Sequence, residues 1–82
     1  MNVKLYMKSP EMALELVKFS NEFADNVDVK CGSILVDGKS ILGVLSIGFP
    51  TEVEVIFHSD NVYALRLFDA YITKLLEDYK EN

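Results

Sequence analysis

The sequence has one cysteine, one histidine, one arginine and no tryptophan among its 82 residues. Cys31 has no second cysteine to pair with, so an intrachain disulfide and a cysteine-rich metal site are both excluded. A small domain without disulfides is typical of a reducing compartment. His58 is not accompanied by clustered cysteines or carboxylates, which makes it a poor metal ligand, and we expect neither a metal nor another cofactor.

Positive charge is scarce as well. Eight lysine and arginine residues stand against thirteen aspartate and glutamate residues, giving a formal net charge of −5. Binding to nucleic acid depends on clustered basic side chains, so we expect no nucleic-acid partner. No stretch approaches the ~20 apolar residues that span a bilayer, and the first residues lack a signal-peptide pattern. We therefore expect a cytoplasmic protein with no membrane partner.

Apolar residues, in contrast, make up half of the chain, and phenylalanine and tyrosine are spread along it. This composition can bury enough surface to order a chain of this length. There is no repeat, linker or low-complexity segment, so residues 1–82 are predicted to form one domain.

The first half of the chain shows clear periodicity. Residues 3–7 alternate between apolar and polar, as a half-buried strand does. Ser9-Pro10-Glu11 then has the features of a helix start, and an apolar stripe continues to a predicted end at Asp25-Asn26. "VDVKC" and "SILV" indicate two more strands. The turn between them is ambiguous, because both Cys31-Gly32-Ser33 and Asp37-Gly38 would serve.

The second half predicts three further elements. The apolar run after Ser40 is too short for periodicity to decide, but Ser40 as N-cap favours a two-turn helix closed by Gly48 and Pro50. "EVEVIF" alternates as a strand. An amphipathic helix follows from about Asn61 to Tyr79, with Ser59 or Asp60 as its predicted cap. The order β-α-β-β-α-β-α predicts an α+β fold with helices on one face of an antiparallel sheet.

The segment "DGKS" resembles the end of a phosphate-binding P-loop, but the spacing is wrong. Such a loop has four residues between its first glycine and Gly-Lys-Ser, whereas five separate Gly32 from Gly38. The intervening Ile34, Leu35 and Val36 favour a strand, not a loop that surrounds phosphate. Nucleotide binding is therefore rejected.

The run "GKSILGVLSIG", residues 38–48, resembles the segment around the regulatory serine of HPr, the phosphocarrier of the bacterial sugar phosphotransferase system. The similarity is looser over about residues 12–77. It implies an HPr-like open-faced β-sandwich, with a four-stranded antiparallel sheet covered on one face by three helices. It also implies that the first hairpin turn lies near Gly32. The family's regulatory serine corresponds to Ser40.

The family's active histidine has no counterpart here. HPr carries its phosphoryl group on a histidine at the start of the first helix, near an arginine. Counting back from Ser40 without gaps, these positions fall on Ser9 and Glu11. A neutral imidazole is needed as nucleophile, and a carboxylate in place of the arginine would repel phosphate by a few kcal/mol at ~4 Å. We therefore expect no catalytic residue and no enzyme activity.

HPr binds its partners through the short second helix and the neighbouring start of the first, and the resemblance transfers this docking role to residues 40–49. A two-turn helix cannot bury all of its apolar residues, so an exposed patch is expected. We predict that Leu42, Leu45 and Phe49 are exposed. Val44, Ile47 and Ile41 are the candidates for the core. The predicted docking residues are Ile41, Leu42, Leu45, Ile47 and Phe49.

The leading hypothesis is a non-catalytic regulatory module of the phosphotransferase system family that Ser40 phosphorylation controls. The resemblance implies protein partners: phosphotransferase components, a serine kinase or a transcriptional regulator. The alternative is an active phosphocarrier in sugar transport whose acceptor is Ser9 or His58. A third hypothesis is a paralogue that keeps the fold without the partners. The sequence leaves the oligomeric state open.

Overall fold

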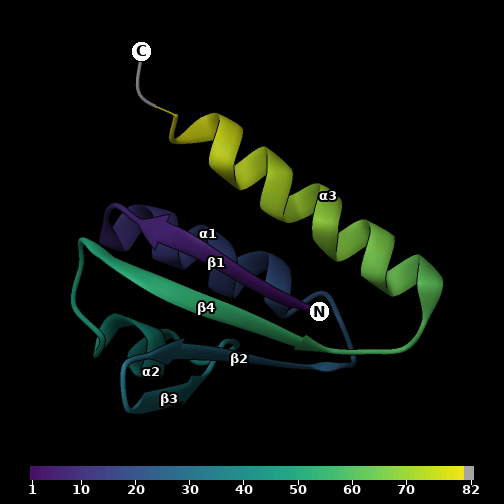
Figure 1. Cartoon of the computed structure of the whole chain (residues 1–82), viewed down its shortest axis with the longest axis horizontal. Helices are drawn as coiled ribbons and strands as arrows, with labels where there is room; N and C mark the ends of the chain where they lie inside the picture. The colour runs from purple at the N-terminus through teal and green to yellow at the C-terminus, as the bar shows by residue number, and fades with distance from the viewer. Residues whose placement is uncertain (81–82) are drawn as a thin grey trace.

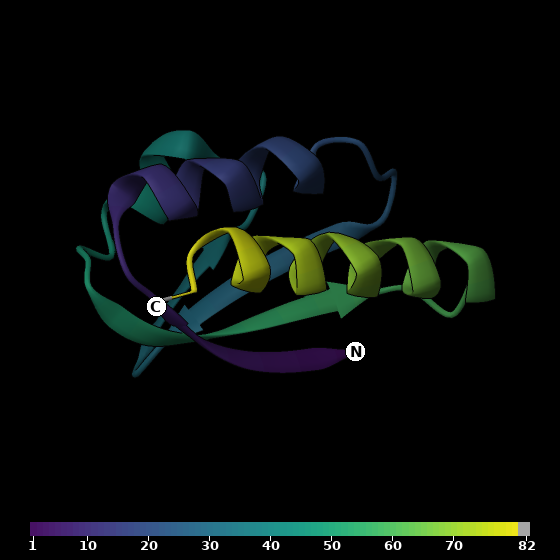
Figure 2. The same cartoon turned by 90° about the horizontal axis from the view of Figure 1, so that it is seen from above.

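The structure is a computed structural model that describes residues 1–80, and its elements follow the predicted order. They are β1 (Asn2–Met7), α1 (Pro10–Ser20), β2 (Asn26–Cys31), β3 (Ile34–Asp37), α2 (Ile41–Leu45), β4 (Thr51–His58) and α3 (Val62–Asp78). The strands form one sheet in the order β1-β4-β2-β3, and every neighbouring pair is antiparallel. Figure 1 shows this arrangement, and Figure 2 shows all three helices on one side of the sheet. The predicted open-faced sandwich is confirmed.

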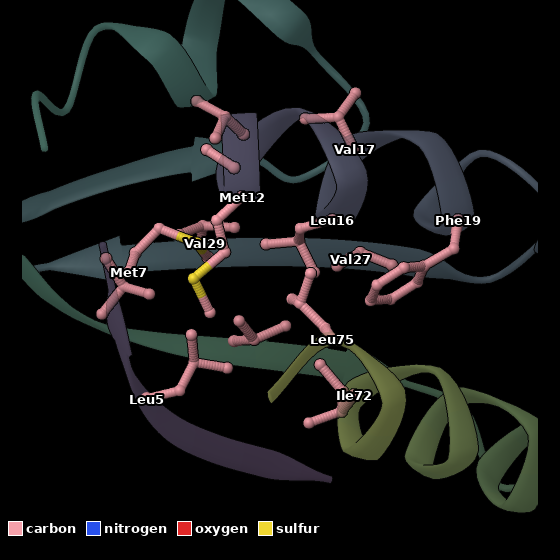
Figure 3. Close-up of a cluster of buried hydrophobic side chains, with 14 of the residues drawn as sticks. Leu5, Met7, Met12, Leu16, Val17, Phe19, Val27, Val29, Ile72 and Leu75 are labelled. Atoms are coloured by element: carbon pink, nitrogen blue, oxygen red, sulfur yellow. The ribbon is translucent and has the colours of Figure 1, made fainter. Parts of the chain in front are cut away.

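The core lies between the sheet and the helices. Alternate strand residues point toward the helices, as the period-2 pattern requires, and meet the apolar stripes of α1 and α3. Figure 3 shows part of this cluster. Phe57 of β4 stacks on Phe68 of α3 with ring centroids 4.2 Å apart, and Phe23 meets both rings edge-on. No helix among residues 1–80 is long and apolar enough to cross a membrane.

Helix α1 begins as predicted and ends earlier than predicted. The Ser9 hydroxyl caps it by accepting a hydrogen bond from the Met12 amide at 3.2 Å. The helix ends at Ser20, not at Asp25-Asn26, because the Asn21 side-chain amide donates to the Val17 carbonyl at 2.8 Å and closes the last turn. Phe23 is buried as expected, but from the loop after the helix.

The hairpin between β2 and β3 turns at Gly32-Ser33, which resolves the ambiguity in the sequence. Gly32 has a φ of 60°, a conformation that favours glycine. Gly38 is buried instead: its amide donates to the Val27 carbonyl at 2.7 Å, and a Cβ there would lie 2.7 Å from Val27 Cγ1. Asp37-Gly38 therefore ends β3 and leads into α2.

The cap of α3 differs from the prediction. Asn61 caps the helix, since its side-chain oxygen accepts from the Tyr63 amide at 2.9 Å and the Ala64 amide at 3.1 Å. Ser59, one of the two predicted caps, instead accepts from the Asn61 amide at 3.1 Å and orients the capping residue. Asp60, the other predicted cap, is exposed and precedes the capping residue, so that prediction is wrong. The expected helix range agrees with the structure within a residue at each end.

Candidate functional site

Ser40 caps α2 as the sequence predicts. Its hydroxyl accepts a hydrogen bond from the Gly43 amide at 3.0 Å, and its carbonyl accepts from the Val44 amide at 2.9 Å. A Cβ at position 43 would lie 3.1 Å from Ser40 Oγ, so glycine leaves room for the capping hydroxyl. The Ser40 side chain is partly exposed.

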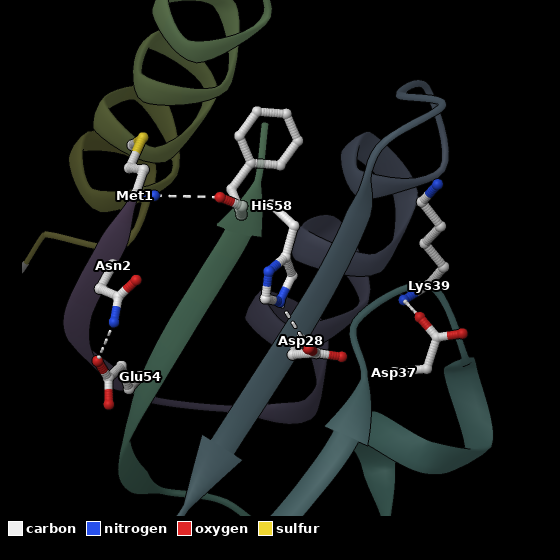
Figure 4. A network of polar contacts seen from close by, with 8 residues as sticks. Met1, Asn2, Asp28, Asp37, Lys39, Glu54 and His58 are labelled. Carbon is white, nitrogen blue, oxygen red and sulfur yellow. Dashed lines mark hydrogen bonds and ion pairs between the residues drawn. The ribbon is translucent and has the colours of Figure 1, made fainter. Parts of the chain in front are cut away.

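The loop before Ser40 is fixed to the end of α1. The Lys39 amide donates to the Asp37 carboxylate at 2.9 Å, a contact visible in Figure 4. The Asn21 side chain donates to the Lys39 carbonyl at 3.1 Å, and the Lys39 ammonium donates to the Phe23 carbonyl at 2.5 Å. Carbonyls after a helix carry partial negative charge, which suits a cation. The start of α2 is therefore held in place by contacts with the end of α1 and the loop after it.

The far end of α2 leads back to the start of α1. Gly48 has a φ of 81°, the Phe49-Pro50 peptide bond is cis, and Thr51 then pairs with Met7, two residues before Ser9. Ser40 and Ser9 therefore lie toward opposite ends of α1, whose eleven residues span about 16 Å. The two serines do not share a site.

The apolar residues of α2 divide differently from the prediction. Leu42 is 82% exposed, as expected, but Ile41 is 53% exposed and does not join the core. A helix of five residues presents only one side chain inward, and Val44 takes that place. The other predicted docking residues, Leu45, Ile47 and Phe49, are partly buried. The prediction that Leu45 and Phe49 are exposed is therefore wrong.

The start of α1 carries a capping serine followed by a carboxylate. The Ser9 hydroxyl is used as the helix cap, and Glu11 is exposed in the first turn. The neighbouring Lys8 ammonium donates to the Tyr79 carbonyl near the end of α3. The carboxylate of Glu11 therefore places negative charge at the start of α1.

His58 lies on the face of the sheet that the helices do not cover. Its Nε2 is 2.7 Å from Asp28 Oδ2, as Figure 4 shows, and Asp28 is the cross-strand partner of Asp37. No local pattern in the sequence indicates this pair, because Asp28 becomes a neighbour of His58 only through the β2–β4 register. Among the described residues no group of three potential ligands could hold a metal ion.

No protein-family model matches the sequence, and no curated protein is significantly similar to it. Solved structures do match. The histidine-containing phosphocarrier protein of Mycoplasma superposes with a TM-score of 0.74 at 15% identity, covering 95% of this chain and 93% of that chain. The chain has the HPr fold.

Two further structures support this assignment. HPr-C-His from Thermoanaerobacter tengcongensis gives a TM-score of 0.69 at 21% identity, over 94% of this chain and 96% of that one. The catabolite repression protein Crh of Bacillus subtilis, described as a domain-swapped dimer, gives 0.59 at 29% identity, over 88% and 87%. The HPr fold thus accounts for nearly the whole chain.

Proposed function

We propose that this HPr-like chain is a non-catalytic interaction module that docks protein partners through an α2 patch of Ile41, Leu42, Leu45, Ile47 and Phe49. The observation that carries the proposal is the 82% exposure of Leu42 on a helix whose start is already fixed by hydrogen bonds from Asn21 and Lys39. Exposed apolar side chains on a rigid element bind with little loss of conformational entropy.

Phosphoryl carriage is disfavoured by the groups at both alternative acceptors. Ser9 Oγ is a helix cap beside the Glu11 carboxylate, which would repel an approaching phosphate. His58 is held by Asp28 with Asp37 opposite, so two carboxylates would repel an approaching phosphate. Both arrangements place carboxylates where a transferring phosphoryl group needs cationic stabilisation.

Ser40 is the proposed regulatory position. A phosphate there would add about −1.5 to −2 charges directly beside Ile41 and Leu42. This charge would change the α2 patch from apolar to strongly anionic at one end, and so alter which partner binds. The proposed partners are phosphotransferase components, a serine kinase or a transcriptional regulator, and the proposed location is the cytoplasm.

Incubation with radiolabelled phosphoenolpyruvate and the general phosphotransferase enzyme tests the absence of carriage. We expect no acid-labile label on this chain, whereas an HPr that has its histidine, included as a positive control, becomes labelled. Label that disappears in Ser9→Ala or His58→Gln would contradict the proposal and favour a phosphocarrier.

Docking is tested separately with the catabolite regulator and serine kinase that bind HPr proteins. We expect Leu42→Asp to weaken binding by about tenfold or more, because a buried apolar contact becomes a desolvated charge. Leu35→Asp is the matched control, since Leu35 is 60% exposed but faces away from the helices, beside Lys30. Equal loss in both variants, or no binding by the unmodified chain, would argue against the patch.

Incubation with the kinase and ATP should label the unmodified chain and not Ser40→Ala.

A further inference from the structure

The outer face of α3 is uncovered in the part of the chain that the structure describes. Figure 1 shows α3 along one edge of the helix layer, with α1 between it and α2, and the buried residues of α3 are Phe68, Ile72 and Leu75. The opposite side carries exposed residues at helical spacing of three or four, and Tyr63 among them is 83% exposed. This outer stripe consists of Tyr63, Arg66, Ala70, Thr73 and Glu77.

Large apolar side chains flank the outer stripe. Val62 is 57% exposed, Leu67 is 51% exposed and Leu76 is 43% exposed. A helix that faced only water would carry polar residues at these positions. The middle of the stripe is small, because Ala70 has only a methyl group and the Thr73 hydroxyl donates to the Asp69 carbonyl at 2.9 Å. Small residues at the centre allow two helices to approach closely.

The charges at the two ends of the stripe are opposite. Arg66, the only arginine of the chain, and Glu77 are eleven residues apart, which is about 16 Å along a helix. Neither side chain is recorded in a hydrogen bond or ion pair with another residue within 1–80. Each is therefore available to a partner.

The stripe is complementary to its own reverse. If a second copy of α3 packs antiparallel about the midpoint between Tyr71 and Ile72, positions equally distant from that point face each other. Arg66 then meets Glu77 of the second copy, and Ala70 meets Thr73 of the second copy. Both contacts occur twice by symmetry. Two charge pairs thus enclose a centre of small side chains.

Local charge also suits this contact. The whole chain carries −5, and this charge would make copies repel each other. The exposed side of α3 is nearly balanced, however, with two basic residues against three acidic ones: Arg66 and Lys74 against Asp69, Glu77 and Asp78. From this complementarity we propose that two copies of the chain form an antiparallel dimer through α3, with Arg66 of each copy against Glu77 of the other.

Sedimentation equilibrium at low salt tests the dimer. We expect the unmodified chain to dimerise. Either single charge reversal, Arg66→Glu or Glu77→Arg, should raise the dissociation constant of the dimer by about tenfold or more, because it replaces two attractive contacts by two repulsive ones. The combined Arg66→Glu, Glu77→Arg variant restores the pairing with reversed signs and should dimerise within about threefold of the unmodified chain.

Leu35→Asp, on the face of the sheet that the helices do not cover, is the matched control and should dimerise normally. Circular dichroism checks that each variant is folded, because exposed positions should tolerate these substitutions. The proposal would be overturned by a monomer at every concentration, by a dimer unaffected by the single charge reversals, by failure of the double reversal to restore the dimer, or by loss of the dimer in Leu35→Asp.

Discussion

Tyr71 of α3 donates its phenolic hydroxyl to the Glu22 carboxylate at 2.9 Å, which links α3 to the loop that follows α1. The Tyr71 ring also stacks on Phe19, with ring centroids 5.1 Å apart. The hydrogen bond to Glu22, followed by desolvation and the charge of Glu22, raises the pKa of Tyr71 above its usual 10.0. The neutral phenol is therefore the form that the folded state favours.

This shift predicts the alkaline behaviour of the chain. The contribution of Tyr71 to stability is fully present below the pKa of an unfolded tyrosine, and it is lost as pH rises through the higher folded pKa. In an absorbance titration at alkaline pH, we expect Tyr71→Phe to remove an ionisation that occurs above the usual pKa of tyrosine. Glu22→Gln should move that ionisation toward lower pH. An unchanged titration in both variants would refute the assignment.

Ser20 predicts a substitution that does not destabilise. The residue is fully buried at the end of α1, and its hydroxyl has no hydrogen-bond partner within residues 1–80. Removal of an unsatisfied buried hydroxyl relieves a desolvation cost, and alanine also has the higher helix propensity. We expect Ser20→Ala to raise the free energy of unfolding by about 1 kcal/mol.

Urea denaturation measures this effect, and Ser46→Ala serves as control. The Ser46 hydroxyl donates to the Gly43 carbonyl at 2.6 Å and is exposed, so its loss should give no gain in stability. A clear loss of stability in Ser20→Ala would mean that the hydroxyl has a partner, such as a buried water.

Much of the fold could be predicted from the sequence because local signals and burial agree. The alternation in β1 and β4, and the caps Ser9 and Ser40, are each determined by neighbours a few residues away. The predictions were wrong where contacts between residues far apart in the sequence determine the structure. Phe23 follows the helix yet is buried, because Phe57 and Phe68 receive it.

The position of α2 could be predicted from the sequence, but the exposure of its side chains could not. The cap at Ser40 predicts where α2 begins, whereas the exposure of Ile41 depends on how α2 lies over the sheet, which no local pattern encodes. Lys39 and Asn21 fix the start of that helix through contacts 16 and 18 residues apart in the sequence. The Asp28–His58 pair likewise requires the register of β2 with β4.

Loss of the Ser40 cap should destabilise the chain modestly. Ser40→Ala removes the acceptor for the Gly43 amide, and we expect a loss of about 1 kcal/mol in the free energy of unfolding. Ser40→Asp retains a capping oxygen and should lie within about 0.5 kcal/mol of the unmodified chain. Thermal denaturation with calorimetry compares them. Equal stability of all three chains would show that the cap contributes nothing.

Gly38 should be the least replaceable glycine described here, for steric reasons. A Cβ at this position would lie 2.7 Å from Val27 Cγ1 and 3.0 Å from the Val27 carbonyl oxygen, so the loop before Ser40 would have to move away from β2. We expect Gly38→Ala to cost about 1–3 kcal/mol of unfolding free energy, as overpacking usually does.

Gly32→Asn is the control, because nothing lies within 4 Å of a Cβ there and asparagine tolerates its φ of 60°. The amides of Lys39, Ser40 and Gly43 should exchange with deuterium faster in Gly38→Ala than in Gly32→Asn, since their hydrogen bonds depend on the position of this loop. Unchanged stability and exchange in Gly38→Ala would mean that the loop does not need its close contact with Val27.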